Sequence, residues 1–392
     1  MRDVVVIGAG PAGAVTADRL AAAGHDVVML EEHGAIGEPV HCTGLLGDEA
    51  FAEFDLPAAL SLARAESARF WGAAGQSVLV QSDAVCASII DRAALDTLLA
   101  ERASARGVEV RRRARAEAVA VMADRVRITV RDSSTTIDAR ACVLACGANY
   151  RFHRALGLGL PSAFLQSAQL ETVFPVHPGI EVRFGRAVAP GGFAWIVPFS
   201  RDGGPRARIG LMSETRARER FTAFADVLAN HESVGFRIMG QPRLKMLPLG
   251  PIARTYNDRV LAVGDAAGLV KPTTGGGIYY GMLSGDMAAA TLDAGLRRDR
   301  LEASGLAQYE QAWKKRLGSE IRAGLRFRKV VSAFSDESID ALIDLAKVNG
   351  VVPLLQKTAS FNWHRKAAMA LLGHPAFRRI ALKSWTRGAG LV

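Results

Sequence analysis

The segment that most constrains the fold lies at the start of the chain, "DVVVIGAGPAG". Residues 3–7 form an apolar run typical of a buried strand. Gly8, Gly10 and Gly13 follow with G-x-G-x-x-G spacing and open a stretch that predicts a helix to about residue 23. The next apolar run, "DVVMLEE", predicts a second strand. This order of elements predicts a βαβ unit that binds a dinucleotide.

The residue types of this unit narrow the choice of dinucleotide. Its glycines permit a tight turn and a close approach of the backbone to a pyrophosphate, which the helix N-terminus would face. Glu31 closes the second strand, 23 residues after Gly8, where a carboxylate accepts hydrogen bonds from ribose hydroxyls. Because a carboxylate repels a 2′-phosphate, FAD or NAD fits this site better than NADP.

A second glycine and aspartate signature, "DRVLAVGDAAG", favours FAD over NAD. Its apolar strand ends at Gly264 and Asp265, where a carboxylate can hold a hydroxyl of the ribityl chain. The run "VKPTTGGGIYYG" follows and places glycines before an expected helix. We expect backbone amides near Gly276 to lie against the edge of the isoalloxazine ring, where they would stabilise negative charge on the reduced flavin.

Length and composition exclude several classes of protein. The chain has 392 residues, of which 49% are apolar and 22% charged, which is typical of a globular protein with a sizeable core. No apolar run reaches the roughly 18 residues of a membrane span, and no signal-peptide layout is present, so we expect a cytoplasmic protein. Cys142 and Cys146 are expected in one strand, about 13 Å apart and too distant for a disulfide. The cysteine spacing indicates no metal site.

The net charge of +10 is concentrated at one end of the chain. Residues 311–392 hold 15 Lys/Arg and 5 Asp/Glu, whereas residues 1–310 are neutral overall. The basic region is expected to be helical, since apolar residues of "SIDALIDLAK" recur at helical spacing: Ile339, Leu342, Ile343 and Ala346. Such a region suits an anionic membrane surface or a phosphate-bearing ligand, or is an ordinary solvated face. Nucleic acid is disfavoured, because no binding motif for it is present.

Five motifs together resemble the geranylgeranyl reductase family over roughly residues 1–300. They are "VVVIGAGPAGAVTA…E", "GEPVHCTG", "IIDRAALD", "PGGFAWIVP" and "VLAVGDAAGLVKPTTGGGI". The family is a branch of the FAD enzymes that also includes aromatic hydroxylases and flavin-dependent halogenases. The fourth motif is similar to the family signature Y-x-W-x-F-P, with Phe193 in place of the tyrosine and Val197 in place of the phenylalanine, while Trp195 and Pro198 are kept.

The resemblance implies an α/β fold of three parts. A discontinuous, Rossmann-like FAD-binding domain would comprise residues 1–65, 85–160 and 250–300. An antiparallel β-sheet domain for the substrate would comprise 66–84 and 161–249, and a basic helical region 301–392. Within the sheet, "SARFWG" and "QSVLVQ" are expected to pair, and "GIEVRFG", "GGFAWIVPFS" and "PRARIGLMS" to add further strands.

The resemblance also implies which residues form the site. Cys42, in a loop that passes over the flavin in this family, is the main candidate for a proton donor or substrate guide; the alternative is a structural thiol. His41 and Tyr280 are further catalytic candidates, with Tyr279 beside them. Phe193, Trp195 and Ile196 are expected to line an apolar substrate tunnel, unless Trp195 is simply core. Cofactor binding is expected from Gly8, Gly10, Pro11, Ala12, Gly13, Glu31, Glu32, Cys42, Gly44, Arg92, Gly147, Gly264, Asp265, Pro272, Gly275, Gly276, Gly277 and Ile278.

One departure from the hydroxylase relatives bears on the electron donor. They carry an Asp-Gly pair where this chain has Cys146 and Gly147, and a thiol cannot replace that carboxylate. The sequence also lacks a second G-x-G-x-x-G motif. Electrons are therefore expected from NAD(P)H that binds transiently, or from a donor such as a ferredoxin.

These features predict an FAD-dependent reductase that transfers hydride to carbon–carbon double bonds of prenyl or other lipid-like substrates. One alternative is an FAD-dependent monooxygenase or halogenase on the same scaffold. Halogenases usually carry W-x-W-x-I-P and a lysine near the flavin, whereas this chain has only one tryptophan of that motif, Trp195, and has Lys271 in the flavin loop. The other alternative is a membrane-surface flavoprotein that binds lipid without turnover.

Overall fold

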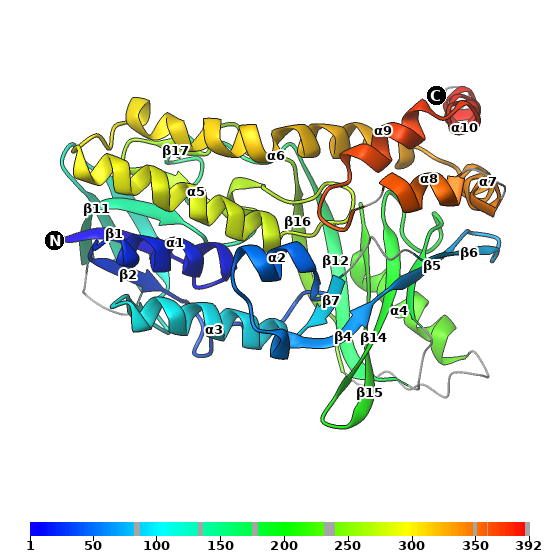
Figure 1. The fold of residues 1–392 in the computed structure, drawn as a ribbon, viewed down its shortest axis with the longest axis horizontal. Coiled ribbons are helices and arrows are strands. Elements are labelled where there is room, and N and C mark those ends of the chain that lie inside the picture. Colours follow the sequence, from blue (N-terminus) through cyan, green and yellow to red (C-terminus); the bar gives the residue numbers. More distant parts are fainter. Residues whose placement is uncertain are drawn as a thin grey trace. The chain divides into compact units, whose positions relative to one another are not determined.

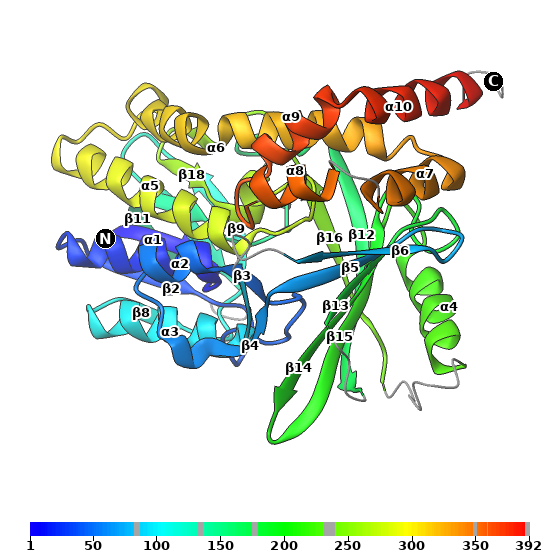
Figure 2. The ribbon, with the colours of Figure 1, turned by 45° about the vertical axis from the view of Figure 1, so that its right-hand side comes forward.

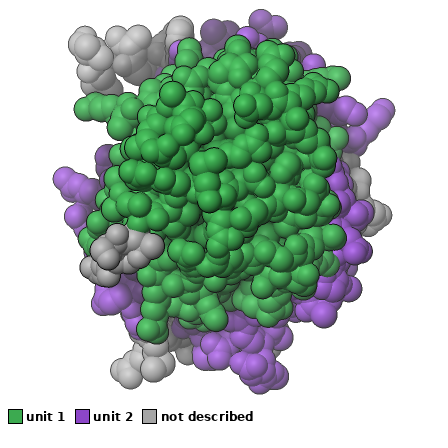
Figure 3. Space-filling view, turned by 90° about the vertical axis from the view of Figure 1, so that its left-hand side faces the viewer, with its two compact units in different colours: residues 1–40, 92–163, 248–321 green, residues 41–91, 164–247, 322–392 purple. Residues whose placement is uncertain are grey.

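The computed structural model describes residues 1–81, 87–131, 136–174, 179–230, 240–347, 351–358 and 360–388. Of the four cysteines, Cys86 lies outside these ranges. The chain divides into two compact units (Figure 3). Unit 1 comprises residues 1–40, 92–163 and 248–321, and unit 2 comprises residues 41–91, 164–247 and 322–392.

Unit 1 is built on a mainly parallel sheet in the order β17-β18-β11-β1-β2-β8. The central strands β1 (Arg2–Ile7), β2 (Val27–Leu30), β11 (Thr136–Leu144) and β18 (Val260–Ala262) pair in parallel. Their apolar runs are buried, as a parallel sheet covered on both faces requires. At one edge, β8 (Glu109–Arg111) pairs in parallel with β2, and at the other, β17 (Tyr256–Asn257) pairs antiparallel with β18. Strand β10 (Val126–Val130) pairs antiparallel with β11 and with β9 (Ala116–Val121).

Helix α1 (Pro11–Ala22) lies between two other helices of unit 1. It packs against α3 (Arg92–Ala105) and runs beside α5 (Ile278–Arg297) (Figure 1). The α1–α5 approach is very close, because a Cβ atom on Gly285 would lie 2.4 Å from the Ala12 carbonyl oxygen. This packing brings the two glycine motifs together although more than 250 residues separate them.

Unit 2 contains two sheets. A small sheet has the order β3-β7-β4, from Leu45–Gly47, Ala87–Ile90 and Ser61–Ala65. A large sheet has the order β16-β12-β15-β14-β13-β5-β6. Its strands are Arg243–Leu249, Ala163–Val173, Gly204–Ser213, Phe193–Arg201, Ile180–Arg183, Ser67–Trp71 and Ser77–Gln81. The predicted pairing of "SARFWG" with "QSVLVQ" is confirmed, and β13 and β5 pair in parallel within this sheet.

Helices complete unit 2. Helix α4 (Ala217–Ala229) packs on one face of the large sheet (Figure 2), where Ile196, Ile209, Phe221 and Phe224 share a core. Shorter helical turns are α2 (Asp48–Glu53) and η1 (Ala58–Leu60). The basic end of the chain is helical: the end of α6 (Ala303–Val331), then α7 (Asp336–Lys347), α8 (Val351–Thr358), α9 (Arg365–Gly373) and α10 (Pro375–Gly388).

The units divide the chain at residues other than those predicted. Residues 41–65 and 87–91 fall in unit 2, because β3 and β4 pair with β7 rather than with the parallel sheet. The predicted start of the basic region also differs, since residues 301–321 belong to unit 1. Strand β11 ends at Leu144, so Cys146 follows the strand instead of sharing it with Cys142. Across the described ranges, no helix combines the length and apolarity needed to cross a bilayer.

Candidate functional site

The turn between β1 and α1 contains glycines of two kinds. A Cβ atom on Gly8, whose φ is +112°, would lie 2.3 Å from the Ala145 carbonyl oxygen, and one on Gly13 would lie 2.0 Å from the Gly8 carbonyl oxygen. These two glycines are therefore required by the packing of the protein itself. Gly10 differs, because among the described atoms none lies within 4 Å of the position of its absent side chain. The turn is thus open at the one glycine where a pyrophosphate must approach.

The N-terminus of α1 is prepared to hold an anion. Gly10 is its N-cap and Pro11 its first residue, and in the described structure no side chain caps its amide groups. Glu31 follows directly after β2; its carboxylate accepts hydrogen bonds from the Ala9 amide at 3.2 Å and the His33 amide at 2.9 Å. The carboxylate therefore lies next to the turn, as ribose binding requires. Glu32 instead lies near Arg115, with 3.5 Å between the charged atoms, at the surface.

The second signature lies against the first. Gly264 has a φ of +58°, and a Cβ atom on it would lie 3.0 Å from the Cβ of Ala12. The Gly264 amide donates to Ser284 Oγ at 2.9 Å, which fixes the end of β18 to α5. Asp265 is the second residue of the short helix η2 (Gly264–Ala267), and the hydroxyl of Tyr150 donates to the Asp265 carbonyl oxygen at 2.7 Å. The two motifs therefore lie together in unit 1, at the place where the sequence predicts the nucleotide to bind.

Side chains of the protein explain part of the glycine run. A Cβ atom on Gly276 would lie 2.7 Å from Lys271 Cε, and one on Gly277 would lie 2.6 Å from Asp265 Oδ1. The bare backbone predicted to accommodate a flavin ring thus also makes room for Lys271 and Asp265. Gly275, with a φ of +71°, closes the loop through its amide, which donates to the Lys271 carbonyl oxygen at 2.8 Å.

Helix α5 begins at Ile278, with Gly277 as its N-cap and no capping side chain in the described structure. Pro272 is buried in the loop before it. Lys271 is only 6% exposed. It was not among the residues predicted to bind the cofactor. The feature that could have indicated it is a lysine within an otherwise largely apolar and glycine-rich segment. Tyr279 and Tyr280 are both buried in the first turn of α5.

Arg92, predicted to contact the cofactor, and Cys146 both have partners in unit 1. Arg92 begins α3, and its guanidinium pairs with the buried carboxylate of Asp96. The Cys146 thiol donates to the Asn149 carbonyl oxygen at 3.2 Å, and burial raises its pKa to about 12. It therefore stays protonated and uncharged near neutral pH. Gly147 beside it has a φ of +62°, and no described atom lies within 4 Å of the place where its side chain would be.

In unit 2, Cys42 lies in a loop that two contacts hold in place. The Gly44 amide donates to Cys42 Sγ at 3.3 Å, and Gln169 Nε2 donates to the Cys42 carbonyl oxygen at 2.9 Å. Cys42 is partly exposed. Gly44 has a φ of +70°, and a Cβ atom on it would lie 2.1 Å from Arg208 Nη1, so only glycine fits at this position.

Arg208 is a buried residue that sequence reasoning missed. It lies in β15, 1% exposed, and its Nη1 donates to the carbonyl oxygens of Thr43 at 2.8 Å and Ile90 at 3.0 Å. Its Nε donates to the carboxylate of Glu171 at 3.1 Å. The only sequence signal was an arginine in the apolar run "ARIGLMS". Arg208 thus joins the loop that carries Cys42 to the large sheet.

Replacing Arg208 by methionine is expected to destabilise unit 2 and loosen this loop. The substitution removes the Arg208 donor from two buried carbonyl oxygens and leaves Glu171 with only one of its two arginine partners, which costs about 3 kcal/mol of unfolding free energy. Urea unfolding measures the stability, and the rate of Cys42 alkylation measures the loop. Arg201→Met is the matched control: Arg201 also binds Glu171, at 2.8 Å, but is more exposed and should cost about 1 kcal/mol. Equal losses in the two variants would contradict the assigned role.

His41 is a neutral imidazole near neutral pH. Burial and the nearby charge of Lys245 lower its pKa to about 4. It is therefore a poorer proton source than the sequence suggests, since little imidazolium is present at pH 7.

The lowered pKa of His41 predicts that stability falls in acid. Between about pH 6.5 and about pH 4 the unfolded chain binds a proton that the folded chain excludes, so the unfolding free energy decreases as pH falls through this window. The decrease is on the order of 3 kcal/mol and levels off below about pH 4. Urea unfolding across this range checks it, with His41→Gln as comparison. His153, whose pKa burial also lowers, is present in both proteins and cancels. Parallel pH profiles would refute the prediction.

An aromatic row lies on the face of the large sheet opposite α4. Phe193 and Trp195 are on one side of β14, with ring centroids 5.9 Å apart, and Phe184 meets Phe193 edge-on at 5.9 Å. Phe70 stacks on Phe184, so the row continues to β5. Trp195 is 8% exposed and lies over Gly210, where a Cβ atom would be 2.5 Å from the indole.

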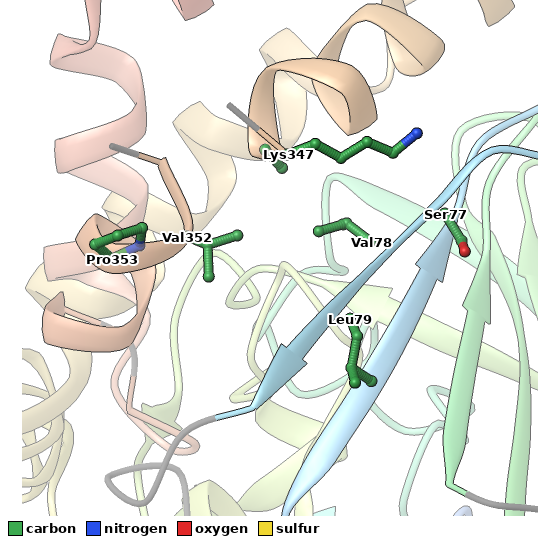
Figure 4. Close-up of a pocket in the computed structure, with 7 residues that line it drawn as sticks. Ser77, Val78, Leu79, Lys347, Val352 and Pro353 are labelled. Atoms are coloured by element: carbon green, nitrogen blue, oxygen red, sulfur yellow. The ribbon is translucent and has the colours of Figure 1, made fainter. Parts of the chain in front are cut away.

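One correction and one pocket follow in unit 2. Ile196 points to the opposite face and belongs to the core with α4, so it does not join the aromatic row. Unit 2 also has an open pocket of about 410 Å³ between β6 and helices α7 and α8 (Figure 4). None of the predicted substrate residues lines it; its lining is Ser77, Val78, Leu79, Ala346, Lys347, Val352 and Pro353. The described residues also include no cluster of His, Cys, Asp and Glu that would hold a metal ion.

Comparison with known proteins identifies the family. The profile of the pyridine nucleotide-disulphide oxidoreductase family matches residues 2–170. Digeranylgeranylglycerophospholipid reductase 2 of Methanothermobacter thermautotrophicus is 30% identical over 355 residues, which cover 87% of this chain and 90% of that protein. The chain belongs to the geranylgeranyl reductase family. The resemblance inferred from sequence motifs is thereby confirmed.

Solved structures share the fold. A geranylgeranyl bacteriochlorophyll reductase-like protein from Thermoplasma acidophilum superposes with a TM-score of 0.83 at 22% identity, covering 98% of this chain and 99% of that one. The halogenase PltM, crystallised with phloroglucinol and FAD, gives a TM-score of 0.67 at 18% identity, covering 97% of this chain and 85% of that one. The predicted α/β class with a Rossmann-like FAD-binding part is confirmed, and FAD fits the open turn at Gly10 and the uncapped helices α1 and α5.

Proposed function

We propose that this protein is an FAD-dependent reductase of carbon–carbon double bonds in prenyl lipids or similar substrates. The observation that carries the proposal is the match, over 87% of the chain, to a protein named digeranylgeranylglycerophospholipid reductase. The aromatic row of unit 2 supports it, because a polyprenyl chain needs an apolar wall. The residues assigned to FAD and substrate from the sequence are part of this proposal.

When bound in its reduced form, FAD would provide hydride chemistry for one carbon of the double bond, and the neighbouring carbon would need a proton. The chain's own residues hold the cofactor and deliver that proton. The amide groups at the N-termini of α1 and α5 favour negative charge on bound groups. Cys42 is the proposed proton source, because the thiol lies in a loop that Arg208 and Gln169 hold in place. Each reduced bond gains two hydrogen atoms.

The electron donor is proposed to be NAD(P)H binding transiently, or a ferredoxin. Turnover with either donor, measured in anaerobic buffer, would decide between them. The predicted absence of a second nucleotide-binding domain motivates the proposal, since a resident nicotinamide has no motif of its own in the sequence.

The test is mass spectrometry of a geranylgeranyl lipid incubated with the chemically reduced holoenzyme under anaerobic conditions. We expect a mass gain of about two units per reduced bond, from the two hydrogens added. A separate aerobic assay would measure oxygen consumption with an aromatic substrate and NAD(P)H. Rapid oxygen consumption there, together with no mass gain in the anaerobic test, would instead establish the monooxygenase or halogenase alternative. Vesicle binding with no product from any alkene would support the lipid-binding flavoprotein without turnover.

A further inference from the structure

The end of the chain carries charge of one sign only. After Asp344 the sequence has eight Lys/Arg and no Asp/Glu. In unit 2 this stretch forms α8, α9 and α10, and α10 packs against α7 and α9. This stretch therefore contributes cations and no carboxylates to unit 2. The positions of these cations on the helices decide which kind of surface they can bind.

Helix α9 exposes cations and one large apolar residue on the same side. Arg365 and Lys366 are exposed, and Met369, one turn further, is 50% exposed. Positions three and four apart lie on one helix face. Ala368 is buried, which shows that α9 packs on the protein along an adjacent side.

Helix α10 repeats this arrangement. Its inner side is fixed by Phe377, whose ring lies 5.8 Å from that of Phe334, and by Ser384, which donates to the Ala333 carbonyl oxygen at 3.3 Å. Its outer side exposes Leu382, at 63%, among three cations: Arg378, Arg379 and Lys383. Figure 2 shows α10 continuing from the end of α9.

We propose that the outer sides of α9 and α10 form a docking face for an anionic lipid bilayer. The face comprises Arg365, Lys366, Met369, Arg378, Arg379, Leu382 and Lys383. An apolar side chain surrounded by cations is the pattern of helices that lie in the membrane interface, where the cations meet anionic headgroups and the apolar side chain enters the acyl boundary. A nucleic acid would neutralise the cations but leave Met369 and Leu382 in water, so the bilayer is the better match. The inference rests on the proposed lipid-like substrate.

The test is flotation of the full-length holoenzyme with vesicles of phosphatidylcholine, with and without phosphatidylglycerol. We expect binding to the anionic vesicles only, weakened by salt. The double substitution M369S/L382S is expected to weaken it about tenfold or more, and R378Q/R379Q/K383Q is expected to do the same. Matched controls on α4 are Val227→Ser, where the side chain is also 63% exposed, and Arg218→Gln. Both controls should bind as the wild type does.

Three outcomes would overturn the proposal. The first is no binding to anionic vesicles, and the second is equal binding of wild type and M369S/L382S. The third is that an oligonucleotide releases the bound protein from the vesicles as efficiently as a soluble anionic lipid does. Activity on a detergent-solubilised geranylgeranyl lipid separates this proposal from the proposed function. The variants should keep that activity, because the face lies outside the predicted cofactor and substrate residues. If vesicle binding persists while no double bond is reduced, only the proposed function fails.

Discussion

Gly10→Val is expected to yield a folded protein that no longer retains FAD. The backbone at Gly10 has a φ of −71°, which any residue adopts, and no described atom lies within 4 Å of the position of an added Cβ. The unfolding free energy should therefore change by less than about 1 kcal/mol. The added side chain instead occupies the space that a pyrophosphate needs, so FAD affinity should fall at least about tenfold, or about 1.4 kcal/mol.

Flavin absorbance per protein and urea unfolding of the apoprotein measure the two effects. The matched control is Gly373→Val, at an open glycine near the end of α9, which should retain FAD. The opposite control is Gly13→Val, which should unfold the nucleotide-binding turn because its Cβ would meet the Gly8 carbonyl oxygen at 2.0 Å. Normal FAD retention by Gly10→Val would show that the pyrophosphate does not approach this turn.

Cys42→Ala is expected to lower the rate of double-bond reduction by about a hundredfold or more. A positioned proton donor typically accelerates a reaction by about 10²–10⁴. Cys42→Ser keeps a hydroxyl of higher pKa at the same place and should fall between alanine and wild type. Bound flavin should be reduced normally in both variants, because the substitution changes the proton supply and not the cofactor.

Anaerobic single-turnover kinetics with a geranylgeranyl lipid measure this rate. Cys146→Ser is the matched control, since a serine hydroxyl can still donate to the Asn149 carbonyl oxygen. His41→Gln tests the competing donor and should change the rate far less, because the imidazole is neutral near pH 7. A wild-type rate in Cys42→Ala, with a large loss in His41→Gln, would reverse the assignment.

Local patterns in the sequence were sufficient for the parts of the fold that local interactions determine. The βαβ unit follows from hydrophobic periodicity and the spacing of Gly8, Gly10 and Gly13. The β5–β6 pair and the helix over "SIDALIDLAK" follow in the same way. In each case the decisive residues lie within one or two turns or strands of one another.

Features set by distant contacts were not predictable. Arg208 lies 165 residues from Thr43, and nothing near it in sequence indicates that its guanidinium fixes the Cys42 loop. Phe70 and Phe184 join the aromatic row only because β13 pairs with β5. Strands β3, β4 and β7 leave the predicted nucleotide-binding domain together, because their pairing into a separate small sheet cannot be recognised from any one of them alone.

The contrast between open and occupied glycines bears on how the family's motifs change during evolution. If a descendant lost its flavin, Gly276 and Gly277 would still be retained, because Lys271 and Asp265 fill the space beside them. Gly10 could be replaced by other residues, since only a ligand forbids a side chain at that position. A homologue that keeps the glycine-rich run but has a bulky residue at the Gly10 position would therefore be a pseudoenzyme, even though a motif search would still score it as a flavoprotein.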